Sequence, residues 1–357
     1  MRESIIHDKL DHLQFSSTIE NGKFLVIKTS DGGYGAQLTA KVLGMKLAYI
    51  FNRTILFDDA SSCYLDCYKP TSNLSLSGLG DYKKIKFDFN QKMTDKVVYL
   101  NFYDYWNDKN HRINFEKWLP DELKKESISH RYFVGQLLQR FELKTECKNY
   151  IEEKKLEIGF KTPIIGMHIR RGDKNTESPY IPIRIFEHYL KKASKNTNIR
   201  RVFVTSDSEK ILDQLPKISG IQYIFDKNEK RYDNANEEML KNSPEIRRQE
   251  TLTALKIIEL LSDCNHIVGQ INTHFTNLAS CLNIAKNGKE NNVSYVNRDY
   301  NDTYLNNDPN PFFYFTDIIR KFGHKALLHF VRKYKSLIFT NEKIYNKLKS
   351  IYYRRKI

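Results

Sequence analysis

The heptapeptide His168-Ile169-Arg170-Arg171-Gly172-Asp173-Lys174 directly follows an apolar segment at residues 163–167. The apolar run predicts a buried strand, which delivers two adjacent arginines and a lysine into a turn. Two guanidinium groups and an ammonium suit an anion that carries several oxygens, and a diphosphate is the usual one. The stretch therefore predicts an anion site at the end of a strand and points to nucleotide-sugar chemistry.

Strand and helix signals alternate on both sides of this stretch. Strands are predicted at residues 24–28, 54–57, 97–100, 163–167, 201–204, 222–225 and 266–268. Helices are predicted at residues 36–51, within about 121–153, and at 183–195, 208–214 and 244–261, the last beginning with a Ser-Pro-Glu cap. Such alternation predicts parallel sheets covered by helices on both faces.

The fold class that follows is α/β and GT-B-like, with two Rossmann-like domains facing a cleft and a basic helical C-terminal tail. Residues 1–155 form the predicted N-terminal α/β domain, on the acceptor side. Residues 156–310 form the predicted nucleotide-sugar-binding domain, and residues 311–357 the basic amphipathic tail. Residues 58–95 are polar and irregular, and the Asn/Asp-rich residues 287–311 are interpreted as a connection without a core element.

Composition excludes several classes of protein. Five cysteines, of which only Cys63 and Cys67 lie close together, suit neither a disulfide framework nor a zinc site, so reduced thiols in the cytoplasm are expected. Residues 1–15 mix charged and apolar residues, unlike a secretory signal, and no later run approaches the ~20 apolar residues of a membrane span.

The net charge of +15 is concentrated near the C-terminus. Residues 318–357 hold twelve lysines and arginines, and Glu342 is their only acid. Apolar residues recur there at helical spacing, which predicts a basic amphipathic helix. We expect the part up to about residue 325 to pack on the N-terminal domain, and the remainder to contact an anionic membrane surface. Nucleic acid is not an expected partner, so the predicted location is cytoplasmic, at the inner membrane face.

Three further motifs lie where a predicted strand ends: Gly32-Gly33-Tyr34-Gly35, Asp207, and Asn272-Thr273-His274. The first offers backbone amides and a helix N-terminus to an anion, and the last adds a hydroxyl and an amide. Each also has a structural interpretation. The glycines suit a tight turn, Asp207 suits a helix cap, His274 suits a buried hydrogen bond, and the arginine pair suits an ion pair with Asp173.

Taken together, these motifs resemble the α-1,6-fucosyltransferases, including the bacterial nodulation type. The resemblance covers about residues 24–58 and 163–282. It rests on Gly33-Tyr34-Gly35-x-Gln37-Leu38 with Arg53-Thr54-Ile55-Leu56, on residues 168–174 with Thr176-Glu177, on Asp207, and on Leu261-Ser262 to Leu278-Ala279. The related α-1,2-fucosyltransferases share the run up to Asp173, including Gly172, whereas Lys174 and the Thr-Glu pair favour the α-1,6 branch.

The resemblance implies an inverting transferase that takes L-fucose from GDP-β-L-fucose and uses neither a metal nor another cofactor. By this analogy the catalytic residues are Arg170, Arg171, Lys174 and Glu177. The arginines hold the diphosphate, Glu177 is the general base, and Lys174 orients it. The implied donor-binding residues are Gly33, Gly35, His168, Asp207, Asn272, Thr273 and His274. A glycan or a lipid-linked saccharide is the implied acceptor.

The sequence departs from the family pattern at three places. Ser208 and Ile257 stand where the family has acids, the second of which reads the guanine edge, and the spacing from Lys174 to Glu177 is one residue shorter. Glu250 and Glu259 are the acids nearest to Ile257 on the same predicted helix. Transfer of another GDP-linked sugar and an α-1,2 linkage therefore stay open, as does a non-catalytic protein that binds membrane or nucleic acid through its tail.

Overall fold

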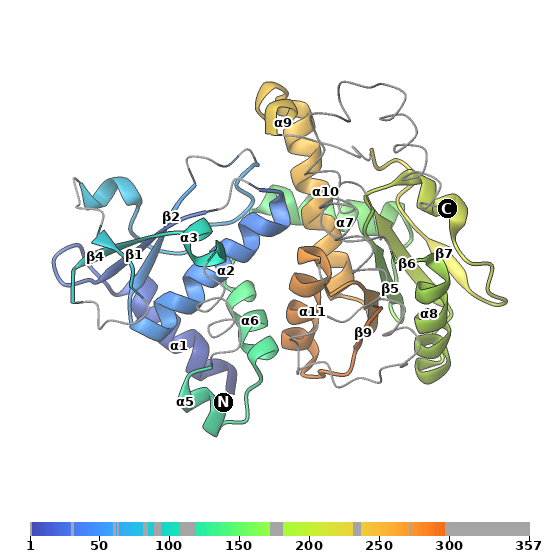
Figure 1. The fold of residues 1–357 in the computed structure, drawn as a ribbon, viewed down its shortest axis with the longest axis horizontal. Coiled ribbons are helices and arrows are strands. Elements are labelled where there is room, and N and C mark those ends of the chain that lie inside the picture. Colours follow the sequence, from blue (N-terminus) through green and yellow to red (C-terminus); the bar gives the residue numbers. More distant parts are fainter. Residues whose placement is uncertain are drawn as a thin grey trace, which may run out of the picture.

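The protein folds into two α/β halves, each built on a parallel sheet (Figure 1). The computed structural model describes residues 2–29, 32–59, 62, 64–80, 85–88, 94–107, 119–171, 181–230, 237–271 and 273–296. The predicted tail at residues 311–357 lies outside these ranges. In the described part of the chain, no helix is both long and apolar enough to cross a membrane.

The N-terminal half contains four strands in the order β2-β1-β4-β3. Its elements are α1 (Arg2–Phe15), β1 (Phe24–Lys28), α2 (Tyr34–Phe51), β2 (Thr54–Asp58), the 3-10 helix η1 (Leu76–Leu79), β3 (Ile85–Lys86), β4 (Val97–Asn101), α3 (Phe102–Asn107), α5 (Asp121–Lys125), α6 (His130–Gln139) and α7 (Thr145–Glu157). All three strand pairings are parallel, with Ile27 opposite both Phe57 and Leu100. The predicted domain boundary at residues 155–156 falls in the last turn of α7.

The C-terminal half contains five strands in the order β7-β6-β5-β8-β9, again all parallel. Its elements are β5 (Ile165–Ile169), α8 (Ile183–Thr197), β6 (Arg201–Ser206), the 3-10 helix η3 (Glu209–Gln214), β7 (Gln222–Ile224), α9 (Glu237–Asn242), α10 (Pro244–Ser262), β8 (His266–Gly269), α11 (His274–Asn287) and β9 (Val293–Tyr295). The predicted GT-B-like α/β fold with two parallel sheets is therefore confirmed.

Alternation along the strands divides the core into two faces. Val202 and Val204 of β6 pack with Phe186 of α8, whereas Phe203 between them belongs to the cluster under α10 and α11. In the N-terminal half, Leu25 and other residues of the same parity face α2, and the opposite face packs on η1. Both sheets are thus covered on two sides, as buried parallel sheets require.

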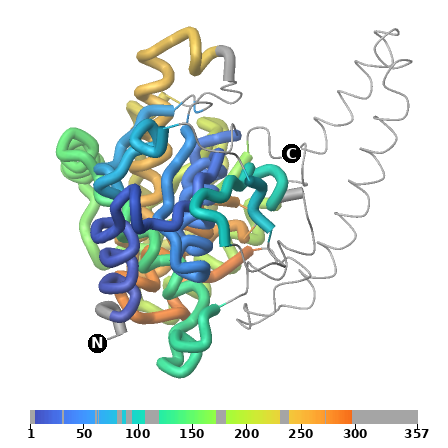
Figure 2. The backbone as a smooth tube through the Cα atoms, turned by 90° about the vertical axis from the view of Figure 1, so that its left-hand side faces the viewer, coloured from blue at the N-terminus to red at the C-terminus, as the bar shows by residue number. Residues whose placement is uncertain are grey.

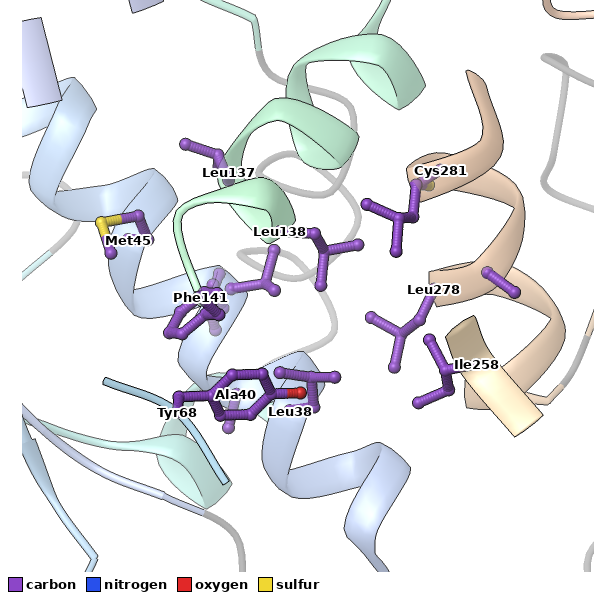
Figure 3. Close-up of a cluster of buried hydrophobic side chains, with 14 of the residues drawn as sticks. Leu38, Ala40, Met45, Tyr68, Leu137, Leu138, Phe141, Ile258, Leu278 and Cys281 are labelled. Atoms are coloured by element: carbon purple, nitrogen blue, oxygen red, sulfur yellow. The ribbon is translucent and has the colours of Figure 1, made fainter. Parts of the chain in front are cut away.

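One apolar core joins the two halves. Helices α2 and α6 of the N-terminal half lie against α10 and α11 of the C-terminal half, between the two sheets (Figure 1). Figure 3 shows the contact, to which α2 contributes Leu38, Ala40 and Met45, α6 contributes Leu137 and Leu138, α10 contributes Ile258, and α11 contributes Leu278 and Cys281. Because this core is continuous, it fixes the position of one sheet relative to the other.

Figure 2, viewed from the N-terminal half, shows that α9 and the start of α10 lie at one end of the molecule, as they do in Figure 1.

Several sequence expectations differ from the structure, and one is the short strand β3 at residues 85–86, inside a region expected to be irregular. Residues 293–295, assigned to a connection, form the edge strand β9, in which Val293 and Tyr295 are buried. A strand of three residues is too short to show periodicity, and its polar flanks hide it. Residues 2–15 form α1, whose Ile6 and Leu10 enter the core, although the sequence reading assigned no helix there.

The start of α10 agrees with the prediction. The Ser243 side chain accepts a hydrogen bond from the Ile246 amide at 3.3 Å, and Pro244 begins the helix. The four described cysteines, Cys67, Cys147, Cys264 and Cys281, are buried free thiols.

The contact between α6 and α11 depends on Gly135. A Cβ atom at this position would lie 2.1 Å from the Cys281 carbonyl oxygen and 2.7 Å from the Ala285 Cβ. We expect Gly135→Ala to lower the free energy of unfolding by about 2 kcal/mol or more, because overpacking outweighs the roughly 1 kcal/mol that alanine gains in a helix. Urea unfolding followed by circular dichroism measures this loss.

Gly78→Ala is the matched control, since its added Cβ meets nothing closer than Ser75 Oγ at 3.6 Å. Equal free energies of unfolding for the two variants would contradict the close packing of α6 on α11.

Candidate active site

The candidate site lies at the carboxyl end of β5, the central strand of the C-terminal sheet. From β5 the chain continues to β6 on one side and later returns to β8 on the other, so the order of strands reverses between β5 and β8. Open α/β sheets bind ligands outside the carboxyl ends of their strands at such a point. Arg170 is the first residue after β5, and Gln270 is the first after β8.

Arg170 is held from both neighbouring strands. Its amide donates a hydrogen bond to Gln270 Oε1 at 2.9 Å, and its guanidinium forms an ion pair with Asp207, which follows β6. The Arg170 side chain nevertheless remains 27% exposed. A partly exposed guanidinium with a fixed backbone is well placed to meet an anionic ligand at this edge.

Arg171 differs from its neighbour. Its amide donates to Asp207 Oδ1 at 2.6 Å, and its guanidinium Nη2 donates to the Ile181 carbonyl at 2.8 Å. Arg171 is buried, so this side chain ties the segment before α8 to the site. Asp207 thus positions both arginines. Its interpretation as a helix cap is wrong, because the N-cap of η3 is Ser208.

A series of hydrogen bonds links the end of β5 to the start of α11. His168 Nδ1 lies 3.0 Å from Thr276 Oγ1, and Thr276 Oγ1 lies 2.9 Å from Thr273 Oγ1. Thr273 is the N-cap of α11, and its hydroxyl lies 3.1 Å from the Gln270 carbonyl. Burial, and then the charge of Arg170, lower the pKa of His168 to about 3, so this imidazole is neutral. His168 and Thr273 are both buried, so they support the ends of the strands.

The glycine turn meets the C-terminal half at the start of α11. A Cβ on Gly35 would lie 2.7 Å from the His274 Cβ, and Thr39 Oγ1 lies 2.9 Å from His274 Nδ1. Gly35 is therefore needed for close packing of α2 on α11, and His274 has the structural hydrogen bond that its alternative interpretation expects. A Cβ on Gly33 would meet only Tyr64 Oη at 3.9 Å, so the fold does not itself require glycine there.

Three predicted site residues, Lys174, Glu177 and Asn272, lie outside the described residues, as do Gly172 and Asp173. Of the others, the structure brings Arg170, Arg171, Asp207, His168 and Thr273 together around the ends of β5, β6 and β8. Gly35 and His274 lie at the adjoining contact between the halves, and Gly33 is the N-cap of α2. Arg53, part of the family motif, is buried and donates to the carbonyls of Phe24 and Asp95.

Glu250 on α10 is a member of the site that sequence reasoning did not assign. Burial, followed by the charge of Glu229, raises the pKa of Glu250 to about 7; Arg170 opposes the shift and Asp207 adds to it. Its carboxyl is therefore within the electrostatic reach of both Arg170 and Asp207. Glu259, nine residues later and so on the opposite helix face, bonds to Lys286, while Ile257 is buried in the core.

A buried ionic cluster lies next to Glu250. Lys256 Nζ contacts Asp226 Oδ2 at 2.6 Å and Glu229 Oε2 at 2.7 Å, and all three side chains are almost fully buried. Asp226 and Glu229 follow β7, so the cluster ties α10 to the carboxyl edge of the sheet. No sequence signal could have found this cluster, because its members lie on separate elements. Lys256 lies in the middle of a predicted helix, and the two acids lie in a loop after β7.

Comparison with known proteins identifies the family. A family model described as "Alpha-(1,6)-fucosyltransferase N- and catalytic domains" matches residues 2–277. The chain belongs to this family. An alpha-(1,6)-fucosyltransferase of Drosophila melanogaster is 24% identical over 228 residues, which are 59% of this chain and 36% of that protein. The chain thus spans about a third of the length of this curated relative.

Solved fucosyltransferase structures are also similar. The fucosyltransferase NodZ from Bradyrhizobium gives a TM-score of 0.46 at 14% identity, covering 72% of this chain and 92% of that one. A NodZ alpha-1,6-fucosyltransferase soaked with GDP-fucose gives 0.39 at 18% identity, covering 73% and 92%.

The raised pKa of Glu250 predicts a pH-dependent stability. Between about pH 4.5 and 7 the unfolded chain releases this proton and the native protein retains it, so the native state loses stability as the pH rises. We expect the stability of Glu250→Gln relative to wild type to improve by about 2 kcal/mol from pH 4.5 to pH 8. Urea unfolding across that range measures the difference.

The matched control is Glu245→Gln, which removes the same charge from the exposed first turn of α10. A Glu250→Gln difference that does not vary with pH would contradict the raised pKa of Glu250, and with it the burial of this carboxyl beside Glu229.

Proposed function

We propose that this protein transfers L-fucose from GDP-β-L-fucose to a hydroxyl of a glycan, with inversion, in α-1,6 linkage and without a metal ion. The observation that carries the proposal is the position of Arg170, partly exposed at the strand reversal point and paired with Asp207. Membership of the alpha-(1,6)-fucosyltransferase family supports the donor and the linkage.

The reaction requires stabilisation of the negative charge on the leaving group and removal of the proton of the acceptor hydroxyl. As the acceptor oxygen bonds to C1 of fucose, the bond from C1 to the β-phosphate oxygen breaks and GDP departs with the electron pair. The Arg170 guanidinium stabilises the negative charge that develops on the leaving phosphate. Asp207 and Gln270 hold Arg170 in place, while Arg171 fixes the adjoining segment through Ile181.

A carboxylate must accept the proton of the attacking hydroxyl. Glu177 is proposed for this role from the family resemblance, which also implies that Lys174 orients it. Glu250 is a second carboxyl whose pKa of about 7 suits proton transfer near neutrality. The variants Glu177→Gln and Glu250→Gln separate the two assignments, because loss of the base removes transfer while donor binding persists.

Arg170→Ala tests the proposal. We expect purified protein to release GDP from GDP-fucose in the presence of EDTA, and the variant to lose about 100- to 1,000-fold in kcat, because one transition-state contact is removed. GDP release measured by a coupled assay, with thermal unfolding as a check of folding, gives the comparison.

Arg184→Ala, an exposed arginine on α8, is the matched control. A strict requirement for a divalent ion, or full activity of Arg170→Ala, would refute the assignment of leaving-group stabilisation to Arg170. A panel of GDP-linked sugars in the same assay distinguishes fucose from another GDP-linked sugar.

The acceptor and the cellular location are also proposals. A glycan or lipid-linked saccharide acceptor fits the proposed reaction. Contact with an anionic membrane surface depends on residues 318–357, whose twelve basic residues are known from the sequence alone.

A further inference from the structure

A separate pocket of about 350 Å³ lies in the N-terminal half, beside the carboxyl end of the edge strand β2. Its walls come from α2, from β2, from the segment of residues 66–76 and from Phe141. Its charged and aromatic lining includes Lys41, Phe57, Asp59, Asp66, Tyr68 and Lys69. The volume is at the lower end of the range for small-molecule sites.

The charges that line this pocket balance each other. Lys41 Nζ lies 2.6 Å from Asp59 Oδ2, and Asp59 Oδ1 accepts a hydrogen bond from Thr29 Oγ1 at 2.8 Å. The other two charged lining residues, Asp66 and Lys69, are likewise in ion pairs, with Lys144 and Glu142. A phosphate or a carboxylate ligand needs surplus positive charge, which this lining does not provide.

A neutral polyol fits such a lining. Each sugar hydroxyl can donate to a carboxylate while it accepts from an ammonium, so the Lys41–Asp59 pair can bind it without leaving a buried charge uncompensated. The Phe57 ring, whose centroid lies 5.4 Å from Lys41 Nζ, and Leu74 provide the apolar surface that the C–H faces of a sugar require.

Chain segments next to the pocket also contact elements of the candidate active site. Thr29 and the Gly33 turn both follow β1, and Gln37 Nε2 donates to the Gly32 carbonyl at 3.1 Å while its Oε1 accepts from Ser62 Oγ at 2.6 Å. Close to Asp66, the Leu65 amide donates to Thr251 Oγ1 at 3.2 Å, which is next to Glu250 on α10. The segment that supplies part of the pocket wall therefore contacts, through Leu65, the helix that carries Glu250.

We propose that this pocket binds one sugar of a neutral oligosaccharide acceptor, at a position away from the hydroxyl that receives fucose. That the bound sugar belongs to the acceptor rests on the proposed function, whereas the binding of a saccharide rests only on the pocket. An acceptor of two or more sugars would then extend from the pocket toward the edge where Arg170 lies.

Two variants test the pocket in different ways. Lys41→Met breaks the ion pair with Asp59, whereas Thr71→Trp fills the pocket and leaves that pair intact. Lys124→Met is the matched control, because it breaks an exposed lysine–aspartate pair of similar length on α5. The probe is an array of neutral and acidic oligosaccharides, on which retention of the full chain is measured without donor.

We expect the wild type and Lys124→Met to be retained on neutral oligosaccharides, and both pocket variants to bind them at least 10-fold more weakly. Used as acceptors, the retained oligosaccharides should show a KM at least 10-fold higher for the pocket variants, with little change in kcat or in the KM for GDP-fucose. Retention on acidic glycans alone, no retention at all, or pocket variants that bind like the wild type would overturn the proposal.

The array also separates this inference from the proposed function. Absence of GDP-fucose turnover combined with pocket-dependent retention on neutral glycans would refute the reaction but not the saccharide site. Normal turnover with unchanged retention by Lys41→Met and Thr71→Trp would refute the site but not the reaction.

Discussion

The apolar contact of α2 and α6 with α10 and α11 is the constraint on which the rest of the structure depends. Helices α2 and α6 belong to the half with the N-terminal sheet, and α10 and α11 belong to the half with the C-terminal sheet. Their packing therefore sets where the carboxyl ends of the two sheets lie relative to each other. Gly35 and Gly135 show how close this contact is, because neither position has room for a methyl group. A site assembled from both halves can be positioned precisely only if such a core does not slide.

Within this frame, Asp207 determines how the two arginines are used. A single carboxylate pairs with the Arg170 guanidinium and accepts from the Arg171 amide, so the two adjacent residues are held at one strand end with different orientations. An arriving diphosphate shares Arg170 with Asp207, and the nearby Glu250 adds negative charge to the same region. Because like charges oppose each other there, protonation of Glu250 and binding of an anion at Arg170 favour one another. If the donor binds at Arg170 as proposed, this arrangement couples its affinity to pH.

The sequence predicted the strands well because buried parallel strands are continuous apolar runs with clear ends. It also predicted the buried face of α2, since Leu38, Val42, Met45 and Tyr49 repeat at helical spacing and are all buried. Lys46 on the same helix runs against that pattern, because it is buried and lies 3.0 Å from His130 Nε2. Hydropathy places a lysine outside, and a local pattern does not show its contact with His130, which is distant in the sequence.

The same limit applies to the site. Arg170 and Asp207 could be named because each follows a recognisable strand, but their pairing depends on strand order, which the sequence does not state. Gln270 and Glu250 lie in segments without a distinctive motif, and they join the site only because β8 and α10 pack beside β5. Contacts between elements distant in sequence therefore decide what local pattern leaves open.

The distribution of charge gives the two halves different chemical roles. The edge of the C-terminal sheet gathers Arg170, Arg171, Asp207 and Glu250, where an anionic leaving group needs a guanidinium and an incoming hydroxyl needs a base. The pocket beside β2 instead balances Lys41 with Asp59 and has apolar walls, so it lacks the surplus positive charge that a nucleotide diphosphate needs and suits the uncharged polyol proposed for it. If the proposed donor and acceptor bind at these two places, the difference in charge separates them, because the donor is charged and a glycan hydroxyl is not. The continuous helical contact between the halves would then hold the two substrates in a fixed relative orientation, which is the condition for transfer of a sugar between them.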